Sequence, residues 1–434
     1  MDYSTASEYI SRSYSCGHKH SFAEYKEFCK YIGALPEKNR VIHVAGTNGK
    51  GSTCAMISSI LINAGHKVGM FTSPHLVSYN ERYRVNNTMI SDEEFEKYVR
   101  IVSQKSEEFF KPGDMLSFFE ILTSVCFLYF ADMQVDFLVL ETGMGGRLDS
   151  TNVIENPLIS VICSVSFDHM RYLGDSLESI AMEKAGIIKK NSNLVLYLQS
   201  DIVYNVVRKV CEDKNTILWY SDSDELRVRE SSLEQTIFSI NNKYLCYDDI
   251  ELKLHGDFQI KNATLVLLAV EAMRHLGVDI PEPAVYRGLA SVVWPGRLEV
   301  VKRLPLTVVD GAHNEDAARV LAENIRLLPG KRKILLIAVF CDKEYSKIIN
   351  LLADECDSVV ITCPEYKDRA VGVAELYSCV VNKNKTIITE NDYKRALMAA
   401  KKVTGEDGII ICAGSLYLAG DIRSYLELGG EACD

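Results

Sequence analysis

The sequence predicts an α/β fold made of two domains. Short apolar, β-branched runs alternate with helix-like segments through the first two thirds of the chain, and this alternation is typical of a parallel sheet with helices on both faces. The pattern breaks at Trp294-Pro295-Gly296, and a second strand–helix alternation starts at Leu306. We therefore expect a first domain over residues 1–296 and a smaller α/β domain over residues 297–434.

The elements of the first domain follow from successive apolar runs. Strands are expected at Arg40–Val44, Val68–Phe71, Phe137–Glu141, Ile159–Val165 and Leu194–Leu198. Helices are expected at Thr53–Ala64, Asp92–Lys105, Phe118–Asp132, Leu177–Ile187 and Asp201–Glu212. From Ser221 to Leu254, polar and apolar residues alternate around a turn at Asn241-Asn242, which predicts an antiparallel hairpin appended to the sheet. A helix over Gln259–Leu276 follows.

The second domain repeats the alternation on a smaller scale. Its strands are expected at Leu306–Val309, Ile334–Val339, Ser358–Thr362, Thr386–Ile388 and Ile409–Ala413. Ligands bind such sheets beyond the carboxyl ends of their strands. We therefore look for functional residues directly after each expected strand.

The segment after the first strand predicts a phosphate-binding loop. Residues 43–53 read His-Val-Ala-Gly-Thr-Asn-Gly-Lys-Gly-Ser-Thr, and the three glycines let several backbone N–H groups point into one concavity. The helix that follows presents its N-terminus there, where its dipole favours anions. Lys50 offers a charge for a β- or γ-phosphate, and Ser52 or Thr53 a hydroxyl for magnesium. Gly51 after the lysine departs from the usual kinase or GTPase spacing.

Composition excludes several functional classes. The 434 residues are 47% hydrophobic and 25% charged, as in ordinary globular proteins. A net charge of −11, without a basic run, argues against nucleic-acid partners. The 13 cysteines form no C-x-x-C pair, which fits a reducing compartment. We find no signal peptide and no apolar stretch of about 18 residues, so we expect a cytoplasmic protein without a membrane partner.

Polar groups also follow three other expected strands. Glu141 ends one strand and precedes a glycine-rich loop, and a carboxylate at that position typically holds magnesium. His169 and Ser73 follow two further strands in the same way. We interpret the three as candidate metal or active-site residues around a triphosphate. Lys184 lies in a helix before Gly186, and its local sequence favours a surface lysine near a glycine cap.

A second possible metal cluster lies near the start of the chain. Cys16, His18 and His20 are closely spaced. They lack a second ligand pair at zinc-site spacing. From the sequence we therefore interpret the segment as a polar loop.

Eight motifs, in order along nearly the whole chain, closely resemble the folylpolyglutamate synthase and dihydrofolate synthase family of Mur ligases. They are HVAGTNGKGST (43–53), TSPHLVSYNER (72–82), ETGMGGRLDSTNV (141–153), DHMRYLG (168–174), AMEKAGI (181–187), GRLE (296–299), DGAHN (310–314) and GSLYL (414–418). The resemblance implies a P-loop ATPase domain with a small appended antiparallel sheet, followed by a Rossmann-like glutamate ligase domain. It further implies ATP-dependent amide ligation through an acyl phosphate.

The resemblance also implies roles for individual residues. Catalytic roles fall to Lys50, Lys184, His169 and Glu141, and magnesium ligands to Ser73, Glu141 and His169. Nucleotide contacts fall to Thr47, Asn48, Gly49, Lys50, Gly51, Ser52, Asn262, Arg297 and Asp310. Pteroate contacts fall to Ser117, Phe118, Phe119, Glu120, Leu148, Asp149 and Ser150, and contacts near the incoming glutamate to His313 and Ser415. Lys184 matches a lysine that is carbamylated in the family, which contradicts its local interpretation.

The substrates implied are ATP, L-glutamate and either a folate or 7,8-dihydropteroate, with two Mg²⁺ ions and a monomeric chain. A potassium requirement fits the family, although the sequence itself does not indicate one. Two alternatives stay open. One is another Mur-type amino-acid ligase, although the phosphate loop begins too early for the extra N-terminal domain that such ligases usually carry. The other is a non-catalytic nucleotide-binding protein, against which Lys50, Glu141, His169 and Lys184 stand together. Whether the acceptor is dihydropteroate, folate or both is not readable from the sequence.

Overall fold

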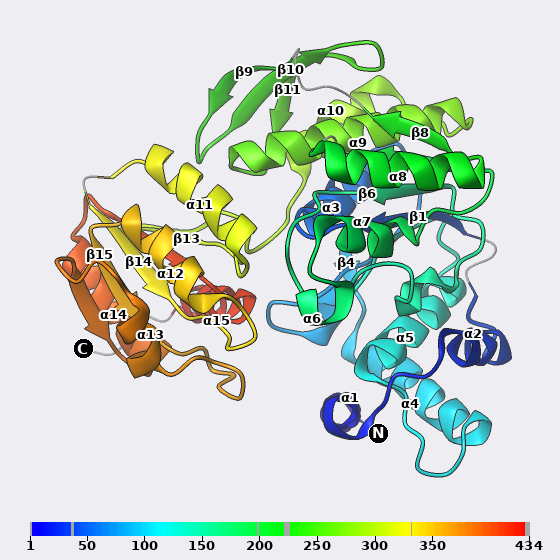
Figure 1. Ribbon diagram of the computed structural model, residues 1–434, viewed down its shortest axis with the longest axis horizontal. Coiled ribbons are helices and arrows are strands. Elements are labelled where there is room, and N and C mark those ends of the chain that lie inside the picture. Colours follow the sequence, from blue (N-terminus) through cyan, green and yellow to red (C-terminus); the bar gives the residue numbers. More distant parts are fainter. Residues whose placement is uncertain (1, 36–38, 198, 221–225, 331, 430–434) are drawn as a thin grey trace. The chain divides into compact units, whose positions relative to one another are not determined.

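The computed structural model describes residues 2–35, 39–197, 199–220, 226–330 and 332–429 (Figure 1). The chain divides into two compact units. The first comprises Met1–Arg227, Ser239–Ile250 and Lys261–Val292, and the second comprises Val228–Phe238, Glu251–Ile260 and Val293–Asp434. Each unit is described by itself below.

The first unit is built on an eight-stranded sheet with the order β4-β3-β2-β5-β1-β6-β7-β8. The six strands from β2 to β8 in this order run parallel, and β3 and β4 add an antiparallel edge. The strand bounds are Arg40–Ala45 (β1), Val68–Phe71 (β2), Tyr83–Val85 (β3), Thr88–Met89 (β4), Phe137–Glu141 (β5), Ile159–Ile162 (β6), Asn193–Leu196 (β7) and Ile217–Tyr220 (β8).

Helices cover both faces of this sheet. The α-helices are Tyr3–Cys16 (α1), Phe22–Tyr31 (α2), Lys50–Asn63 (α3), Asp92–Phe109 (α4), Phe118–Asp132 (α5), Met170–Leu173 (α6), Leu177–Ala185 (α7), Asp201–Lys214 (α8), Asp257–His275 (α9) and Glu282–Ser291 (α10), with 3₁₀ turns at Tyr79–Arg82 and Ser150–Val153. One core cluster joins α1, α2, α4 and α5 to alternate strand residues such as Val41 and Leu138. Helix α3 packs against α10 and against β1, β2 and β5.

The predicted antiparallel sheet is confirmed, and it has three strands in the order β11-β10-β9. The strands are Leu226–Ser231 (β9), Thr236–Asn241 (β10) and Cys246–Leu252 (β11). Buried and less buried residues alternate along β10, as expected for a strand with one covered face. The predicted hairpin began at Ser221, and residues 221–225 lie outside the described residues, as does Leu198 at the end of another predicted strand.

The second unit has a six-stranded sheet with the order β12-β13-β17-β14-β15-β16, parallel except for β12. Its strands are Glu299–Arg303 (β12), Leu306–Val309 (β13), Lys333–Ile337 (β14), Ser358–Ile361 (β15), Thr386–Thr389 (β16) and Ile409–Ala413 (β17). Its helices are Glu315–Leu327 (α11), Tyr345–Asp354 (α12), Val373–Cys379 (α13), Tyr393–Thr404 (α14) and Leu416–Glu427 (α15).

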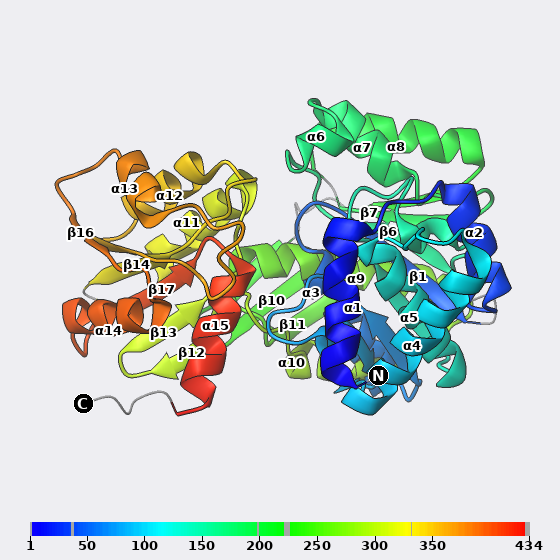
Figure 2. The ribbon, with the colours of Figure 1, turned by 90° about the horizontal axis from the view of Figure 1, so that it is seen from below.

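Successive residues of these strands enter two different cores. Leu335 and Ile411 pack with α11, α12 and α13, whereas Leu336 and Ile410 pack with α14 and α15. Helices therefore cover both faces of this sheet as well, as Figure 2 shows. Such strands are buried on both sides, which explains their unbroken Ile, Leu and Val runs. Among the described residues, no helix combines the length and hydropathy needed to cross a membrane.

Candidate functional site

The phosphate loop connects β1 to α3 and has a conformation that requires glycine at position 49. Gly49 precedes the first residue of the helix, Lys50, and has a φ of +84°. A Cβ atom there would lie 2.5 Å from Oδ1 of Asn262 on α9. The Asn262 side chain therefore packs against Gly49, directly before the N-terminus of α3. The first-turn N–H groups of a helix have no partner within the helix, and together with the helix dipole they suit an anion such as phosphate.

The loop is anchored to the segment that follows β6. The N–H of Thr47 donates to the Ser164 carbonyl at 2.6 Å, and the Thr47 hydroxyl donates to the Ser166 carbonyl at 3.1 Å. The Lys50 ammonium curls over the loop and donates to the carbonyls of Gly46 at 3.2 Å and Thr47 at 3.1 Å. The amine is thereby held at the mouth of the loop.

Glu141 and Ser73 meet beside this loop. Glu141 is the last residue of β5, which pairs with both β1 and β2, so all three strands end at one edge of the sheet. The Glu141 side chain is buried, and its Oε2 accepts a hydrogen bond from the Ser73 N–H at 2.9 Å. The structure therefore brings together two of the three predicted metal ligands.

The third predicted ligand, His169, follows β6, the neighbour of β1 on the other side. His169 precedes α6 with a φ of 51°, in the left-handed region. Its N–H donates to Oδ1 of Asp168 at 2.8 Å, and its side chain is 40% exposed. Non-glycine residues rarely adopt this conformation, and such strain concentrates at functional sites.

Lys184 is not the surface lysine that its local sequence favours, and that interpretation is wrong. It lies on α7, is only 2% exposed, and its Nζ donates to the Gly46 carbonyl at 2.8 Å. Burial, with the nearby Lys50 ammonium, lowers the pKa of Lys184 to about 7, although Asp168 opposes the shift. Lys184 and Lys50 therefore share one carbonyl of the phosphate loop.

The predicted acceptor segment at the start of α5 divides into structural and accessible residues. Glu120 is buried and accepts hydrogen bonds from the N–H and the hydroxyl of Ser117 at 2.9 and 2.7 Å, closing a capping box. The Phe118 ring stacks on Tyr14 with centroids 4.0 Å apart. The Phe119 ring lies against Gly143, where a Cβ atom would come within 2.6 Å of it. Glu120 thus fixes the backbone that carries the two rings.

The loop after β5 is organised in the same way around Asp149. Its buried carboxylate accepts hydrogen bonds from the N–H groups of Met144 at 2.9 Å and Thr151 at 3.0 Å, and burial raises its pKa. The Thr151 hydroxyl also bonds His43 Nε2 at 2.8 Å. Burial lowers the pKa of His43 to about 3. This network was not predicted, although a histidine within an otherwise apolar strand is the sequence signal that could have indicated it. Leu148 is 43% exposed, whereas Ser150 is buried.

In the second unit, the remaining predicted residues gather at the carboxyl ends of the neighbouring strands β13 and β17. Asp310 accepts hydrogen bonds from the N–H groups of Leu298 at 2.8 Å and Ala312 at 2.7 Å. Burial raises its pKa, opposed by the Arg297 guanidinium. An imidazole nitrogen of His313 bonds the Gly311 carbonyl at 2.7 Å. Ser415 follows β17 and caps α15, accepting from the N–H of Tyr417.

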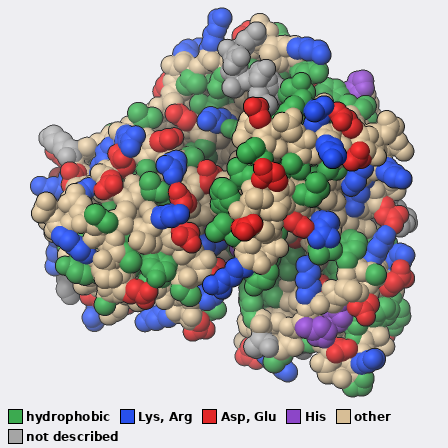
Figure 3. Space-filling view, viewed as in Figure 1, with side chains coloured by type: hydrophobic (Ala, Val, Ile, Leu, Met, Phe, Trp, Pro, Cys, Tyr) green, Lys and Arg blue, Asp and Glu red, His purple; other side chains and the backbone are tan. Residues whose placement is uncertain are grey.

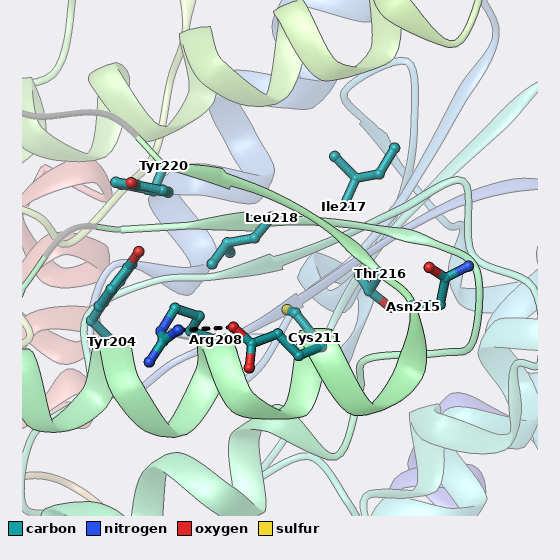
Figure 4. A pocket seen from close by; sticks show the side chains of 9 residues that line it. Tyr204, Arg208, Cys211, Asn215, Thr216, Ile217, Leu218 and Tyr220 are labelled. Carbon is teal, nitrogen blue, oxygen red and sulfur yellow. Dashed lines mark hydrogen bonds and ion pairs between the residues drawn. The ribbon is translucent and has the colours of Figure 1, made fainter.

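A separate pocket of about 360 Å³ lies between α8 and β8 (Figure 4). Its lining residues are Tyr204, Arg208, Cys211, Glu212, Asn215, Thr216, Ile217, Leu218 and Tyr220. The set contains an internal Arg208–Glu212 ion pair at 2.8 Å and no predicted site residue. The phosphate loop, and not this pocket, is therefore the candidate active site.

The sequence matches two Mur ligase family models. Residues 296–416 match the Mur ligase, glutamate ligase domain, and residues 113–270 match the Mur ligase middle domain. The dihydrofolate synthase/folylpolyglutamate synthase of Bacillus subtilis (strain 168) is 37% identical over an alignment of 437 residues, covering 98% of this chain and 99% of the relative. The chain belongs to the dihydrofolate synthase/folylpolyglutamate synthase family. The predicted resemblance is confirmed.

Solved structures of this family confirm the predicted α/β fold. Folylpolyglutamate synthase of Mycobacterium tuberculosis complexed with ADP has a TM-score of 0.87 at 29% identity, covering 97% of this chain and 98% of that chain. Escherichia coli FolC in complex with DHPP and ADP has a TM-score of 0.86 at 26% identity, covering 99% of both chains.

Proposed function

We propose that this protein is an ATP-dependent amide ligase that adds L-glutamate to a folate, to 7,8-dihydropteroate, or to both. One observation carries the proposal: a phosphate loop, a buried carboxylate and a buried lysine meet at one sheet edge in a chain similar to such ligases over nearly its whole length. The anion site at the start of α3 fits the phosphates of ATP. We assign the contacts with them to the loop from Thr47 to Ser52.

The residues around Glu141 fit magnesium. Mg²⁺ prefers oxygen ligands and is usually bound through one or two carboxylates together with substrate phosphates. The buried Glu141 carboxylate beside Ser73 offers such oxygens next to the phosphate loop. We propose that Ser73, Glu141 and His169 hold the ions. Bound there, Mg²⁺ would neutralise charge on the triphosphate.

We further propose that Lys184 is carbamylated. A pKa of about 7 leaves roughly half of the buried amines neutral near pH 7, and the neutral amine is the form that attacks CO₂. The reaction forms an N–C bond, releases one proton and leaves a carbamate anion. Before carbamylation, two positive charges, on Lys50 and Lys184, lie at the Gly46 carbonyl. After carbamylation, the carbamate anion and the Lys50 ammonium form an oppositely charged pair.

The chemistry requires activation of the acceptor, because hydroxide is a poor leaving group. The acceptor carboxylate attacks the γ-phosphorus of ATP, ADP leaves, and an acyl phosphate forms. The glutamate amine then attacks the acyl carbon, a proton is lost, and inorganic phosphate departs as the amide forms. We assign to Lys50 the role of countering the charge on the transferring phosphoryl group, since this step depends mainly on positioning and electrostatics.

We assign the acceptor to the segments Ser117–Glu120 and Leu148–Ser150. The carboxylates of Glu120 and Asp149 are engaged by backbone N–H groups, so they shape the loops. The rings of Phe118 and Phe119 and the exposed Leu148 are better suited to touch a flat aromatic acceptor. In the second unit, we propose Arg297 and Asp310 as nucleotide contacts. His313 and Ser415 are proposed as glutamate contacts in the same unit.

We also propose a domain division, a cellular location and an oligomeric state. We propose a functional division into an ATP-binding part (residues 1–296) and a glutamate ligase domain (residues 297–434), supported by the family match that begins at residue 296. We propose that the protein is a cytoplasmic monomer without nucleic-acid partners. Light scattering after gel filtration tests the oligomeric state. A potassium requirement is tested by exchanging KCl for NaCl in the assay.

The activity is tested by measuring ADP release with MgATP and L-glutamate in three parallel reactions. One contains 7,8-dihydropteroate, one tetrahydrofolate, and one no acceptor. Release with dihydropteroate alone identifies a dihydrofolate synthase, release with tetrahydrofolate alone a polyglutamate synthase, and release with both a bifunctional enzyme. Absence of acceptor-dependent release from folded protein that binds ATP would contradict the proposal.

A further inference from the structure

Three potential metal ligands from two distant segments lie together at the surface of the first unit. His18 and His20 lie between α1 and α2, and Asp114 lies between α4 and α5. One nitrogen of each imidazole and one carboxylate oxygen all lie within 4.8 Å of one another. Figure 3 shows histidine side chains, in purple, on the surface of this part of the molecule. The sequence alone predicts a polar loop here, because Cys16, His18 and His20 have no second ligand pair at zinc-site spacing, and Asp114 lies in a distant segment.

One imidazole nitrogen of His20 is buried and available to bind a metal ion. His20 is only 7% exposed, its ring packs on Phe110 with centroids 4.1 Å apart, and its Nδ1 lies 3.4 Å from Oε2 of Glu120. Its Nε2 is buried and has no hydrogen-bond partner among the described residues. Buried polar atoms without partners are rare in folded proteins. In the tautomer whose Nδ1–H donates a hydrogen bond to Oε2 of Glu120, Nε2 carries the lone pair that can bind a metal ion.

The backbone fixes the two segments against each other. The N–H of His18 donates to the Met115 carbonyl at 3.2 Å, and His18 forms a parallel bridge with Leu116. The N–H of His20 donates to Oε1 of Glu120 at 3.1 Å. The backbone N–H groups of both histidines are therefore fixed, one by the main chain after Asp114 and the other by the Glu120 side chain.

We propose that His18, His20 and Asp114 bind one transition-metal ion of the zinc class. Two imidazoles and one carboxylate, with water in a fourth position, are a donor set that suits Zn²⁺. Ligand bonds of about 2.0–2.2 Å in a tetrahedron would place the ligand atoms roughly 3.4 Å apart. The exposed His18 side chain has room for the rotation that this requires. Glu120 is the outer carboxylate that orients His20.

The site would clamp the segment after α1 onto the start of α5. That start carries Ser117 and Phe118, which are acceptor contacts if the proposed function holds. This ion would be separate from the proposed magnesium ions. Two of its three ligands are imidazole nitrogens, and its ligands lie before α2 and before α5, whereas Glu141 ends β5. Metal occupancy can therefore be tested without ATP, glutamate or folate, so its failure is distinguishable from failure of the proposed ligase activity.

The test is zinc titration of the full-length, metal-stripped, reduced protein in competition with a chromogenic chelator. We expect one Zn²⁺ per chain. The variants His18→Ala and Asp114→Asn alter groups that are exposed or half-buried, so the fold should persist. Each should weaken zinc binding about tenfold to a hundredfold or more. The matched control is His275→Ala, an exposed histidine on α9, which should leave the affinity unchanged.

A spectroscopic readout identifies the ligands. Co²⁺ bound to the wild-type protein should give visible absorption of a tetrahedral nitrogen and oxygen site, and this absorption should disappear in His18→Ala. Equal zinc affinity in the wild type, both cluster variants and the control would overturn the proposal, as would a stoichiometry of zero. Absorption typical of thiolate ligands that persists in both variants would also overturn it.

Discussion

Replacing Lys184 by methionine should stabilise the protein while removing its activity. The substitution keeps an unbranched side chain in the buried position against Gly46. Folding lowers the pKa of Lys184 from 10.5 to about 7, and each pKa unit corresponds to about 1.4 kcal/mol. Below pH 7 the folded state therefore holds a buried ammonium at a cost of about 4–5 kcal/mol. Loss of its hydrogen bond to the Gly46 carbonyl offsets about 1 kcal/mol of the gain.

The difference in stability between Lys184→Met and the wild type should decrease as the pH rises above 7. Between pH 7 and pH 10.5 the unfolded chain binds more protons at this lysine than the folded chain, so wild-type stability from this group rises with pH. Lys184→Met lacks that titration. Its stability advantage should be about 3–4 kcal/mol below pH 7 and should shrink by up to about 1.4 kcal/mol per pH unit above it.

The measurement is denaturant unfolding from about pH 6 to pH 9 in CO₂-free buffers. A Trp294→Phe background leaves Trp219, on β8, as the single tryptophan reporter of the first unit. The matched control is Lys190→Met, because it removes one positive charge from an exposed position nearby. A stability difference for Lys184→Met that stays constant over this pH range would refute the reasoning, as would one that matches the control.

Three further predictions concern the loop and the strand that carries it. Lys50→Met should lower the rate of ADP release by about a hundredfold or more while the circular dichroism spectrum is retained, and a loss below tenfold would contradict the assigned role. Gly49→Ala should cost about 1–2 kcal/mol from its φ alone and more from the contact with Asn262. The control is Gly65→Ala, with a φ of +94° and no atom within 4 Å of the new Cβ. Equal decreases in Tm for the two variants would show that the contact with Asn262 adds no cost. His43 has a folded pKa of about 3, below its ordinary 6.5, so stability should fall as pH drops below 6.5, by up to about 1.4 kcal/mol per unit. In acid denaturation, the stability of His43→Gln should fall less steeply with decreasing pH than that of the wild type. Identical slopes of stability against pH for the two proteins would contradict the burial argument.

Local signals explain which elements could be predicted from the sequence. The strand Phe137–Glu141 and the helix Phe118–Asp132 have the predicted bounds. The strand is a continuous apolar run, as expected for a strand buried on both faces, and the helix begins with a capping box from Ser117 to Glu120. The helix after the phosphate loop begins at Lys50, earlier than predicted, because glycines mask its first turn.

Features that depend on distant partners could not be predicted. Lys184 looks like a surface residue within its own helix, and only the fold brings it to Gly46. The strand predicted to reach Val165 ends at Ile162, because the residues after it turn to bind Thr47. The hydrogen bonds of the Asp149 carboxylate to the N–H groups of Met144 and Thr151 also depend on the folded loop, and no local signal in the sequence predicts them.

The most direct test of the central claim couples ATP cleavage to bond formation in one reaction. The acceptor is supplied with ¹⁸O in its carboxylate, together with MgATP and L-glutamate, and the products are analysed by mass spectrometry. The account predicts one ADP per glutamyl residue added and transfer of one ¹⁸O into inorganic phosphate, and it predicts that Lys50→Met forms all of these products at rates lower by about a hundredfold or more. ADP formation without a glutamylated product, or phosphate without ¹⁸O, would contradict it.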